Sequence, residues 1–297
     1  MIPDFAWIEQ TQKMLFERKQ SVYRRGELLE LILNERSTLG IPANLRESKI
    51  LSALHQRTLL KEVDLHPLTE PKNRAGTYKT VSRFTWGSPS AHEIALSFRS
   101  GSYISHGTAA SLHGLLKEDG SIYVNKEQST KTAKTSTLSQ VGINRAFANR
   151  SRESNYRYGY GKHSIVLLNG KNTNKLAVEN LHTAEHADIA STTLERTLVD
   201  IVVRPAYAGG PQNVLDAFRR ARGRLDIAQL FVIWKQLGYT YPYHQALGFY
   251  LNRAAYPSTD VDVFRSLPNE YDFYLANQIA NKQYDSAWRI HYPRELV

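Results

Sequence analysis

Two helical patterns followed by two strand patterns fill the first 85 residues of the chain. We predict helix over residues 1 to about 35, where apolar side chains form a broad face between charged ones (Leu28, Leu29, Leu31, Ile32 and Leu33). Gly40 and Pro42 interrupt this pattern. A second helix is predicted from Asn44, a favoured N-cap residue that Glu47 follows three positions later.

A strand, a polar loop and a second strand are predicted after these helices. Leu59, Leu60 and Val63 can begin the first strand, and the stretch from Tyr78 to Phe84 alternates as strands do. The loop from Thr69 to Gly76 is rich in turn-forming residues. Helices followed by a strand, a basic loop and a strand are the order expected of a winged helix-turn-helix, although other small α+β units share this order.

A domain boundary is predicted at Gly87-Ser88-Pro89-Ser90, which has loop chemistry. Beyond it, apolar patterns restart at Tyr103-Ile104, and Ser105 is predicted to cap a helix through Leu115. A buried strand is predicted to end in a tight turn at Asn169-Gly170. Helices are predicted over residues 193–203, 214–222, 227–237 and 245–255. We therefore predict an α+β protein, with a winged helix-turn-helix in residues 1–86 and a larger mixed α/β C-terminal domain, rich in helices, in residues 90–297.

Composition bounds the function. The chain has 297 residues, is 41% hydrophobic and carries a formal net charge of +10. This charge favours a polyanionic partner, such as nucleic acid or an anionic membrane surface, over simple solubility. The absence of cysteine excludes disulfides, thiolate nucleophiles and cysteine-bound zinc. No secretory signal and no run of ~20 apolar residues is visible. We therefore expect a cytoplasmic protein with no membrane partner.

Residues 44 to 61 are the first candidate for DNA contact. Arginine, glutamine and serine can read base edges in the major groove, while lysine and arginine neutralise phosphates. The candidate residues on or just beyond the second helix are Arg46, Lys49, Ser52, Gln56, Arg57 and Lys61. The proposed wing adds Lys72, Arg74 and Lys79. The alternatives are an ordinary solvated helix face and a solubilising loop.

A second basic region lies further along the chain. It comprises Lys126, Lys131, Lys134 and the stretch from Arg150 to Lys162, in which tyrosines alternate with basic residues. Tyrosines in such a stretch can stack on unpaired bases, or pack on a core, which we favour. An acidic or RNA-bound partner is a third alternative.

Few residues suggest catalysis or metal binding. His182 and His186 have the spacing of a metal pair, with Glu185 beside them, but a zinc site needs a further ligand. His106 and His113 are better explained as packed or capping residues. Glu195, Arg196 and Asp200 lie on one predicted helix, where a structural role is favoured. We expect no cofactor, no metal and no catalytic residue.

Three segments of the second domain resemble the AbiEi family, the antitoxins of type IV toxin–antitoxin systems. They are Tyr103 to Leu115, which contains His113-Gly114-Leu115; Glu195 to Asp200, with Arg204-Pro205 and Gly209-Gly210 behind it; and Leu247-Gly248-Phe249-Tyr250-Leu251. They span residues 100 to 255 in the family's order. The family has a basic residue before the Leu-Gly pair, where this chain has Gln245-Ala246.

The resemblance implies a bifunctional antitoxin. Its first domain would bind double-stranded DNA at its own promoter and repress it. Inverted repeats are the site expected of a winged-helix regulator of this size. Its second domain would counteract a nucleotidyltransferase-like toxin encoded beside it. The alternative is a nuclease with a helix-turn-helix targeting domain, which would need a metal-binding carboxylate cluster that local motifs do not supply.

Overall fold

The computed structural model describes residues 6–18, 20–69, 79–129, 137–182 and 188–297. The chain divides into two compact units. Unit 1 comprises residues 1–100 and 155–165, and unit 2 comprises residues 101–154 and 166–297. Both contain helices and strands, so the predicted α+β class is confirmed at the level of a mixed fold.

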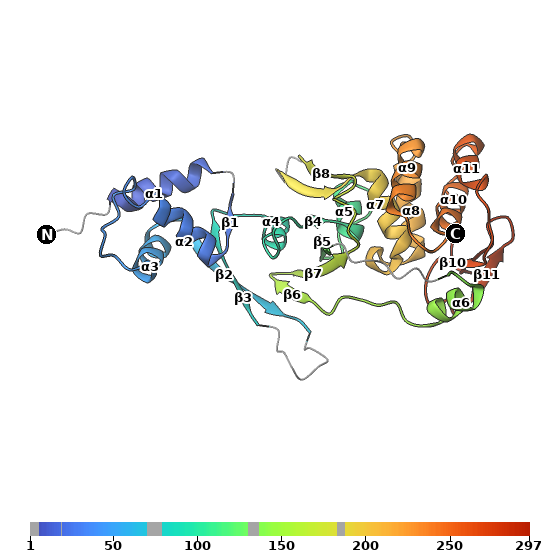
Figure 1. Cartoon of the computed structure of the whole chain (residues 1–297), viewed down its shortest axis with the longest axis horizontal. Helices are drawn as coiled ribbons and strands as arrows, with labels where there is room; N and C mark the ends of the chain where they lie inside the picture. Colours follow the sequence, from blue (N-terminus) through green and yellow to red (C-terminus); the bar gives the residue numbers. More distant parts are fainter. Residues whose placement is uncertain (1–5, 19, 70–78, 130–136, 183–187) are drawn as a thin grey trace. The chain divides into compact units, whose positions relative to one another are not determined.

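Unit 1 places four helices beside a small antiparallel sheet. Its elements are α1 (Ala6–Glu17), β1 (Val22–Tyr23), α2 (Arg25–Asn34), α3 (Glu47–Arg57), β2 (Leu60–Pro67), β3 (Val81–Trp86), α4 (Ala91–Leu96) and β6 (Arg157–Tyr160) (Figure 1). The strand order is β1-β3-β2-β6, and each neighbouring pair is antiparallel. Unit 1 extends past the predicted limit at residue 86, since β6 pairs with β2 through Pro67 and Tyr158.

One apolar core joins the helices of unit 1 to its strands. It contains Trp7 and Leu15 from α1, Leu28 and Ile32 from α2, Ile50 and Leu54 from α3, and Leu60 and Phe84 from β2 and β3. These positions recur at helical or strand spacing, so the same side chains that specify the elements also bind them together. The core thereby fixes which face of α3 meets solvent.

Unit 2 combines a mixed sheet with a group of helices. The sheet has the order β7-β5-β4-β9-β8, in which β4 and β9 are parallel. Its strands are β4 (Tyr103–Ile104), β5 (Ser121–Glu127), β7 (His163–Gly170), β8 (Val178–Leu181) and β9 (Ile189–Thr192). A smaller sheet, β10-β12-β11, is built from β10 (Phe273–Tyr274), β11 (Lys282–Asp285) and β12 (Ile290–Pro293).

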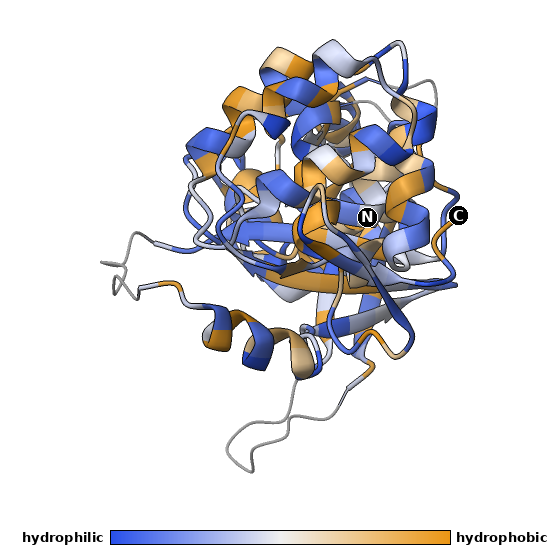
Figure 2. Cartoon of the chain, turned by 90° about the vertical axis from the view of Figure 1, so that its right-hand side faces the viewer, coloured by the Kyte–Doolittle hydropathy of each residue, from blue (hydrophilic) through white to orange (hydrophobic). Residues whose placement is uncertain are grey.

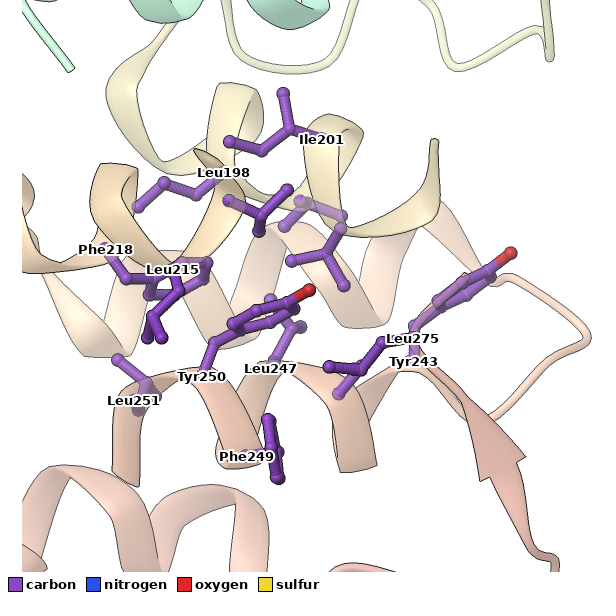
Figure 3. Packing of buried hydrophobic residues seen from close by; sticks show 14 of the residues in the cluster. Leu198, Ile201, Leu215, Phe218, Tyr243, Leu247, Phe249, Tyr250, Leu251 and Leu275 are labelled. Atoms are coloured by element: carbon purple, nitrogen blue, oxygen red, sulfur yellow. The ribbon is translucent and has the colours of Figure 1, made fainter. Parts of the chain in front are cut away.

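The helices of unit 2 surround its core. They are α5 (His106–Leu112), α6 (Gln140–Ala148), α7 (Leu194–Val203), α8 (Pro211–Ala221), α9 (Ile227–Leu237), α10 (Tyr243–Arg253) and α11 (Ser258–Arg265), with the 3-10 turn η1 (Pro205–Ala208). Single helix ribbons alternate between hydrophobic and hydrophilic segments in Figure 2, as amphipathic helices do. Figure 3 shows Leu198 and Ile201 of α7 gathered with Phe218, Leu247 and Tyr250 in this core.

Four local predictions are wrong. Residues 1 to 35 are not one helix, because Val22 and Tyr23 pair with Thr85 and Phe84 as β1. Asn44 is not the N-cap of the next helix, since Arg46 takes the extended cap conformation. Strand β3 begins at Val81, since Lys79 and Thr80 belong to no strand; Tyr78 lies outside the described residues. The helix that follows Ser105 ends at Leu112.

The predicted turn at Asn169-Gly170 is also wrong, because both residues belong to β7. A Cβ on Gly170 would meet the side-chain amide of Asn125 from β5 at 2.5 Å. The glycine therefore permits a close approach of two strands and does not mark a reversal of the chain.

Gly248 allows α10 to pack against a tryptophan. A Cβ at this position would overlap the Trp288 ring, which is 1% exposed and cannot move into solvent. We expect Gly248→Ala to destabilise the protein by about 1–3 kcal/mol or more through overpacking. A lowered midpoint in thermal unfolding followed by circular dichroism would show this effect.

Gly26→Ala is the matched control for Gly248→Ala. Gly26 lies inside α2, and an added Cβ would have nothing within 4 Å. Because alanine is the better helix former, this variant is expected to be neutral or stabilising by up to ~1 kcal/mol. Equal destabilisation by both variants would contradict the packing argument.

Candidate nucleic-acid interface

Helix α3 has one buried side and one exposed side. Ile50, Leu51 and Leu54 are buried in the core of unit 1. The candidate contact residues of the predicted helix and the strand after it are all exposed in the structure: Arg46, Lys49, Ser52, Gln56, Arg57 and Lys61. All six side chains are therefore accessible to solvent.

Lys49, Ser52 and Gln56 form the middle of the exposed side. They are separated by three and then four residues, which places them on one face of a helix, opposite the buried face. Together they offer a cation, a hydroxyl and a side-chain amide. This is the mixture that a protein uses to neutralise phosphates and to read base edges. Arg46 and Arg57 lie at the two ends of α3.

The turn that leads into α3 is organised by Arg36. One guanidinium nitrogen, Nη2, donates hydrogen bonds to the carbonyl oxygens of Pro42 (2.5 Å), Ala43 (3.0 Å) and Leu45 (2.7 Å). These bonds gather three carbonyls of the turn, of which that of Pro42 also accepts from the amide of Leu45 at 3.0 Å. Arg36 therefore fixes the path of the chain between α2 and α3. The sequence patterns gave no signal for this role, because its partners are backbone atoms.

Thr58 ends α3 and begins the strand that follows. Its hydroxyl donates to the carbonyl of Leu54 at 2.6 Å and accepts from the amide of Leu60 at 3.1 Å. Lys61 therefore lies directly after α3, on the exposed side of β2 and opposite Thr85. Basic residues therefore lie both at the end of α3 (Arg57) and at the start of β2 (Lys61).

The hairpin of β2 and β3 carries charges of both signs. Lys79, just before β3, is exposed, whereas Lys72 and Arg74 lie outside the described residues. On β2, the exposed Asp64 accepts a hydrogen bond from the Ser82 hydroxyl at 2.5 Å. The acidic side chains make the strands themselves poor phosphate ligands, so the basic contacts on the described part of the hairpin are Lys61 and Lys79.

In the second basic region, some side chains are buried and others are exposed. Tyr158 is buried, with its ring 4.7 Å from that of Phe98, whereas Tyr156 is exposed and has the Arg99 guanidinium 5.8 Å from its ring centroid. Lys126 is exposed at the end of β5, and Lys131 and Lys134 lie outside the described residues. The tyrosines therefore do not form one continuous stacking surface.

The polar residues of α7 are structural in their contacts. Arg196 and Asp200 form a buried ion pair with Nε 2.8 Å from Oδ1, and Arg196 also donates to the carbonyl of Leu176 at 3.0 Å. Glu195 accepts from the backbone amide of Asp226 at 3.4 Å. The ion pair raises the pKa of Arg196 despite the opposing effect of burial. Asn213 supports the Gly209-Gly210 turn by donating to the carbonyl of Ala208 at 2.9 Å.

The two histidines of the first resembling segment have different positions. His106 begins α5 with a left-handed φ of 54° and packs edge-on against Tyr207. Burial lowers its pKa to about 4, so it is neutral at pH 7. His113 follows the last residue of α5, and its Nε2 lies 2.7 Å from the carbonyl oxygen of Thr192. These contacts account for both rings as packed and capping groups.

His182 pairs with an aspartate in the described structure. Its Nδ1 lies 3.2 Å from Asp188, and both side chains are largely exposed. Its predicted companion His186, like Glu185, lies outside the described residues. The described ranges contain no group of three or more His, Cys, Asp or Glu residues placed to hold a metal ion. Within the same ranges, no helix is long and apolar enough to cross a membrane.

Comparison with known proteins gives a likeness of fold. No family model and no curated protein matches the sequence. Among solved structures, the chain is similar to the RV2827C protein from Mycobacterium tuberculosis, with a TM-score of 0.57 and 14% sequence identity. The match covers 98% of this chain and 92% of that one. At this identity the likeness concerns the fold alone.

We expect Arg36→Ala to disturb α3 without touching its exposed face. Removing the guanidinium takes a charge-assisted donor from three carbonyls, of which that of Pro42 keeps its backbone hydrogen bond from Leu45, at a cost of about 1–3 kcal/mol. The variant should unfold at a lower temperature and lose protection from hydrogen exchange in residues 42–50. Arg25→Ala, at an exposed position on α2, should leave both properties as in the wild type. Unchanged exchange in residues 42–50 would contradict the role given to Arg36.

Proposed function

We propose that residues 1–86 form a winged helix-turn-helix that binds double-stranded DNA. The order of elements supports this: α1, β1, α2, α3, β2 and β3, with β3 hydrogen-bonded to both β1 and β2. In such a domain the second helix of the motif enters the major groove and the hairpin lies beside it. Here these would be α3 and the β2–β3 hairpin.

The observation that carries the proposal is the exposed face of α3. A helix held by three buried apolar residues presents Lys49, Ser52 and Gln56 on its opposite side. A helix face that only contacts solvent could carry any polar residues, so the combination of a cation, a hydroxyl and an amide supports a binding role. The net charge of +10 adds to the electrostatic attraction for a polyanion.

We further propose that the whole chain is a DNA-binding antitoxin of a type IV toxin–antitoxin system. This part rests on the resemblance to the AbiEi family between residues 100 and 255. The resembling segments fall on β4 with α5, on α7 and on α10. The chain would repress its own promoter through unit 1, and residues 90–297 would counteract a nucleotidyltransferase-like toxin without a cofactor and without catalysis of their own.

Gln245 stands just before the Leu-Gly pair, where the family has a basic residue, and its contacts in this chain are structural. It is fully buried, and its side-chain nitrogen donates to the carbonyls of Tyr271 (2.9 Å) and Trp288 (2.7 Å). A neutral amide therefore holds the segments that follow α10. The proposal assigns no contact with the toxin to this position.

The DNA proposal predicts two separable effects in α3. Ser52→Ala/Gln56→Ala should lower discrimination between the promoter and unrelated DNA, because base-edge contacts carry about 1–3 kcal/mol of discrimination each. Lys49→Glu/Lys61→Glu should weaken binding to both DNAs, and the salt slope should fall by about one unit for each lost phosphate contact. Electrophoretic mobility shifts at several salt concentrations measure both quantities.

Lys13→Glu/Lys235→Glu is the matched control, since it makes the same change in net charge at exposed positions outside α3 and the hairpin. It should bind nearly as the wild type does. A footprint of the promoter should show two protected, inverted half-sites. Wild-type affinity in both α3 variants would sink the assignment of α3. Cleavage of DNA in the presence of magnesium would instead favour the nuclease alternative.

The antitoxin proposal predicts that toxin control survives loss of DNA binding. Co-expression of the chain with the neighbouring nucleotidyltransferase-like gene should restore growth. The Lys49→Glu/Lys61→Glu variant should restore growth equally when expressed from an unrelated promoter, because toxin control is proposed to reside in residues 90–297. Growth is scored at matched protein levels. A variant that is abundant yet fails to restore growth would place part of the antitoxin surface in unit 1.

A further inference from the structure

Unit 2 contains a cavity of about 620 Å³ that no part of the proposed DNA interface uses. Its walls come from four places in the chain: the end of α6 with residues 149–152, the end of α7 with η1, the segment before α10, and the residues after β10. The volume is within the range of ~300–1,000 Å³ typical of small-molecule sites.

The charge of the lining is one-sided. Arg150, Arg152 and Arg204 line the cavity, and no aspartate or glutamate does. Arg150 is paired at the edge with Glu153 at 3.5 Å. Over the part of the chain that the structure describes, the guanidinium groups of Arg152 and Arg204 have no hydrogen-bonded or acidic partner. Two exposed arginine forks are thus available to an anion at this site.

The remaining lining mixes aromatic and amide side chains with aliphatic ones. Tyr241, Tyr243 and Tyr274 contribute rings, and Asn277 contributes an amide. Tyr243 is buried, and burial raises its pKa to about 12 even though Arg204 acts in the opposite direction. It therefore remains a neutral hydrogen-bond donor at pH 7. Aromatic walls suit a flat heterocycle, whereas arginine forks match phosphate oxygens.

The walls are held in place before any ligand binds. Asn277 donates from Nδ2 to the carbonyls of Ala146 (3.1 Å) and Asn149 (2.9 Å), and the amide of Gln278 donates to Phe147 at 2.8 Å. The amide of Ser154 donates to the hydroxyl of Tyr207 at 3.0 Å, which anchors the far end of the arginine-bearing segment. A preformed site loses less conformational entropy on binding.

We infer that this cavity binds a nucleoside phosphate, with the base against the tyrosine-lined wall and the phosphates on Arg152 and Arg204. The shared chemistry is a phosphorylated nucleoside, which can be free or part of a single strand. This site is separate from α3, so it stands or falls independently of the DNA proposal.

Isothermal titration of the full chain with ATP, GTP, CTP and inorganic triphosphate tests the inference. At least one nucleotide should bind, and more tightly than inorganic triphosphate. Arg152→Ala/Arg204→Ala should weaken that binding at least ~10-fold, because each arginine makes charge-assisted hydrogen bonds. Promoter binding by this variant should match the wild type. A short single-stranded RNA that displaces the nucleotide would identify the source as a strand; failure to displace it would identify a free nucleotide.

Arg222→Ala/Arg294→Ala is the matched control, since both residues are exposed in unit 2 and lie outside the lining. It should bind the nucleotide as the wild type does. If the Ala double variant loses cooperative unfolding, Arg152→Gln and Arg204→Gln tested singly replace it. Absence of nucleotide binding at millimolar concentration, equal binding by the Arg152/Arg204 variants, or equally tight binding of inorganic triphosphate would each overturn the inference.

Discussion

The burial of α7 is the constraint on which the architecture of unit 2 depends. Eight consecutive residues of this helix, from Glu195 to Val202, are buried, so neighbouring elements must cover it on every side. Two of these residues are a charged pair. Removing one partner of such a pair would leave an uncompensated buried charge, which costs several kcal/mol. The carbonyl of Leu176, which accepts from Arg196, thus ties the loop before β8 to the helix. The end of α7 then delivers Arg204 to the cavity wall.

In unit 1, the buried side chains of α3 are all apolar, and its exposed side carries the polar residues. The side chains that bury α3 leave only one orientation in which Ile50 and Leu54 are covered. That orientation exposes Lys49, Ser52 and Gln56, whatever their use. Arg36 and Thr58 then fix the two ends of α3 by satisfying backbone groups. A DNA-binding face in this unit would therefore be a consequence of core packing, with rigidity supplied by the turn and not by the contacting residues.

Local sequence rules worked where a single element contains the whole pattern. The helix from Ile227 to Leu237 has the predicted limits, and Gly238 ends it with a left-handed φ of 54°. The exposed side of α3 could be predicted from the sequence in the same way, because the spacing of its apolar residues already defines the buried face. The rules failed where a partner strand decides the conformation. Val22 and Tyr23 became a strand because β3 lies beside them, and Gly170 serves the approach of Asn125 instead of a turn.

The sequence by itself determined the mixed α+β class, the buried faces of most helices, the basic character of the chain and the exposed residues of α3. These follow from periodicity and composition, which are local or global sums over residues. Tertiary structure alone decided that β6 pairs with β2, about ninety residues earlier, and that Arg150 and Arg152 share a cavity with Arg204 and Tyr241. These contacts join segments whose sequence patterns are unrelated. Neither segment alone specifies the contact, because the packing of the elements between them brings them together.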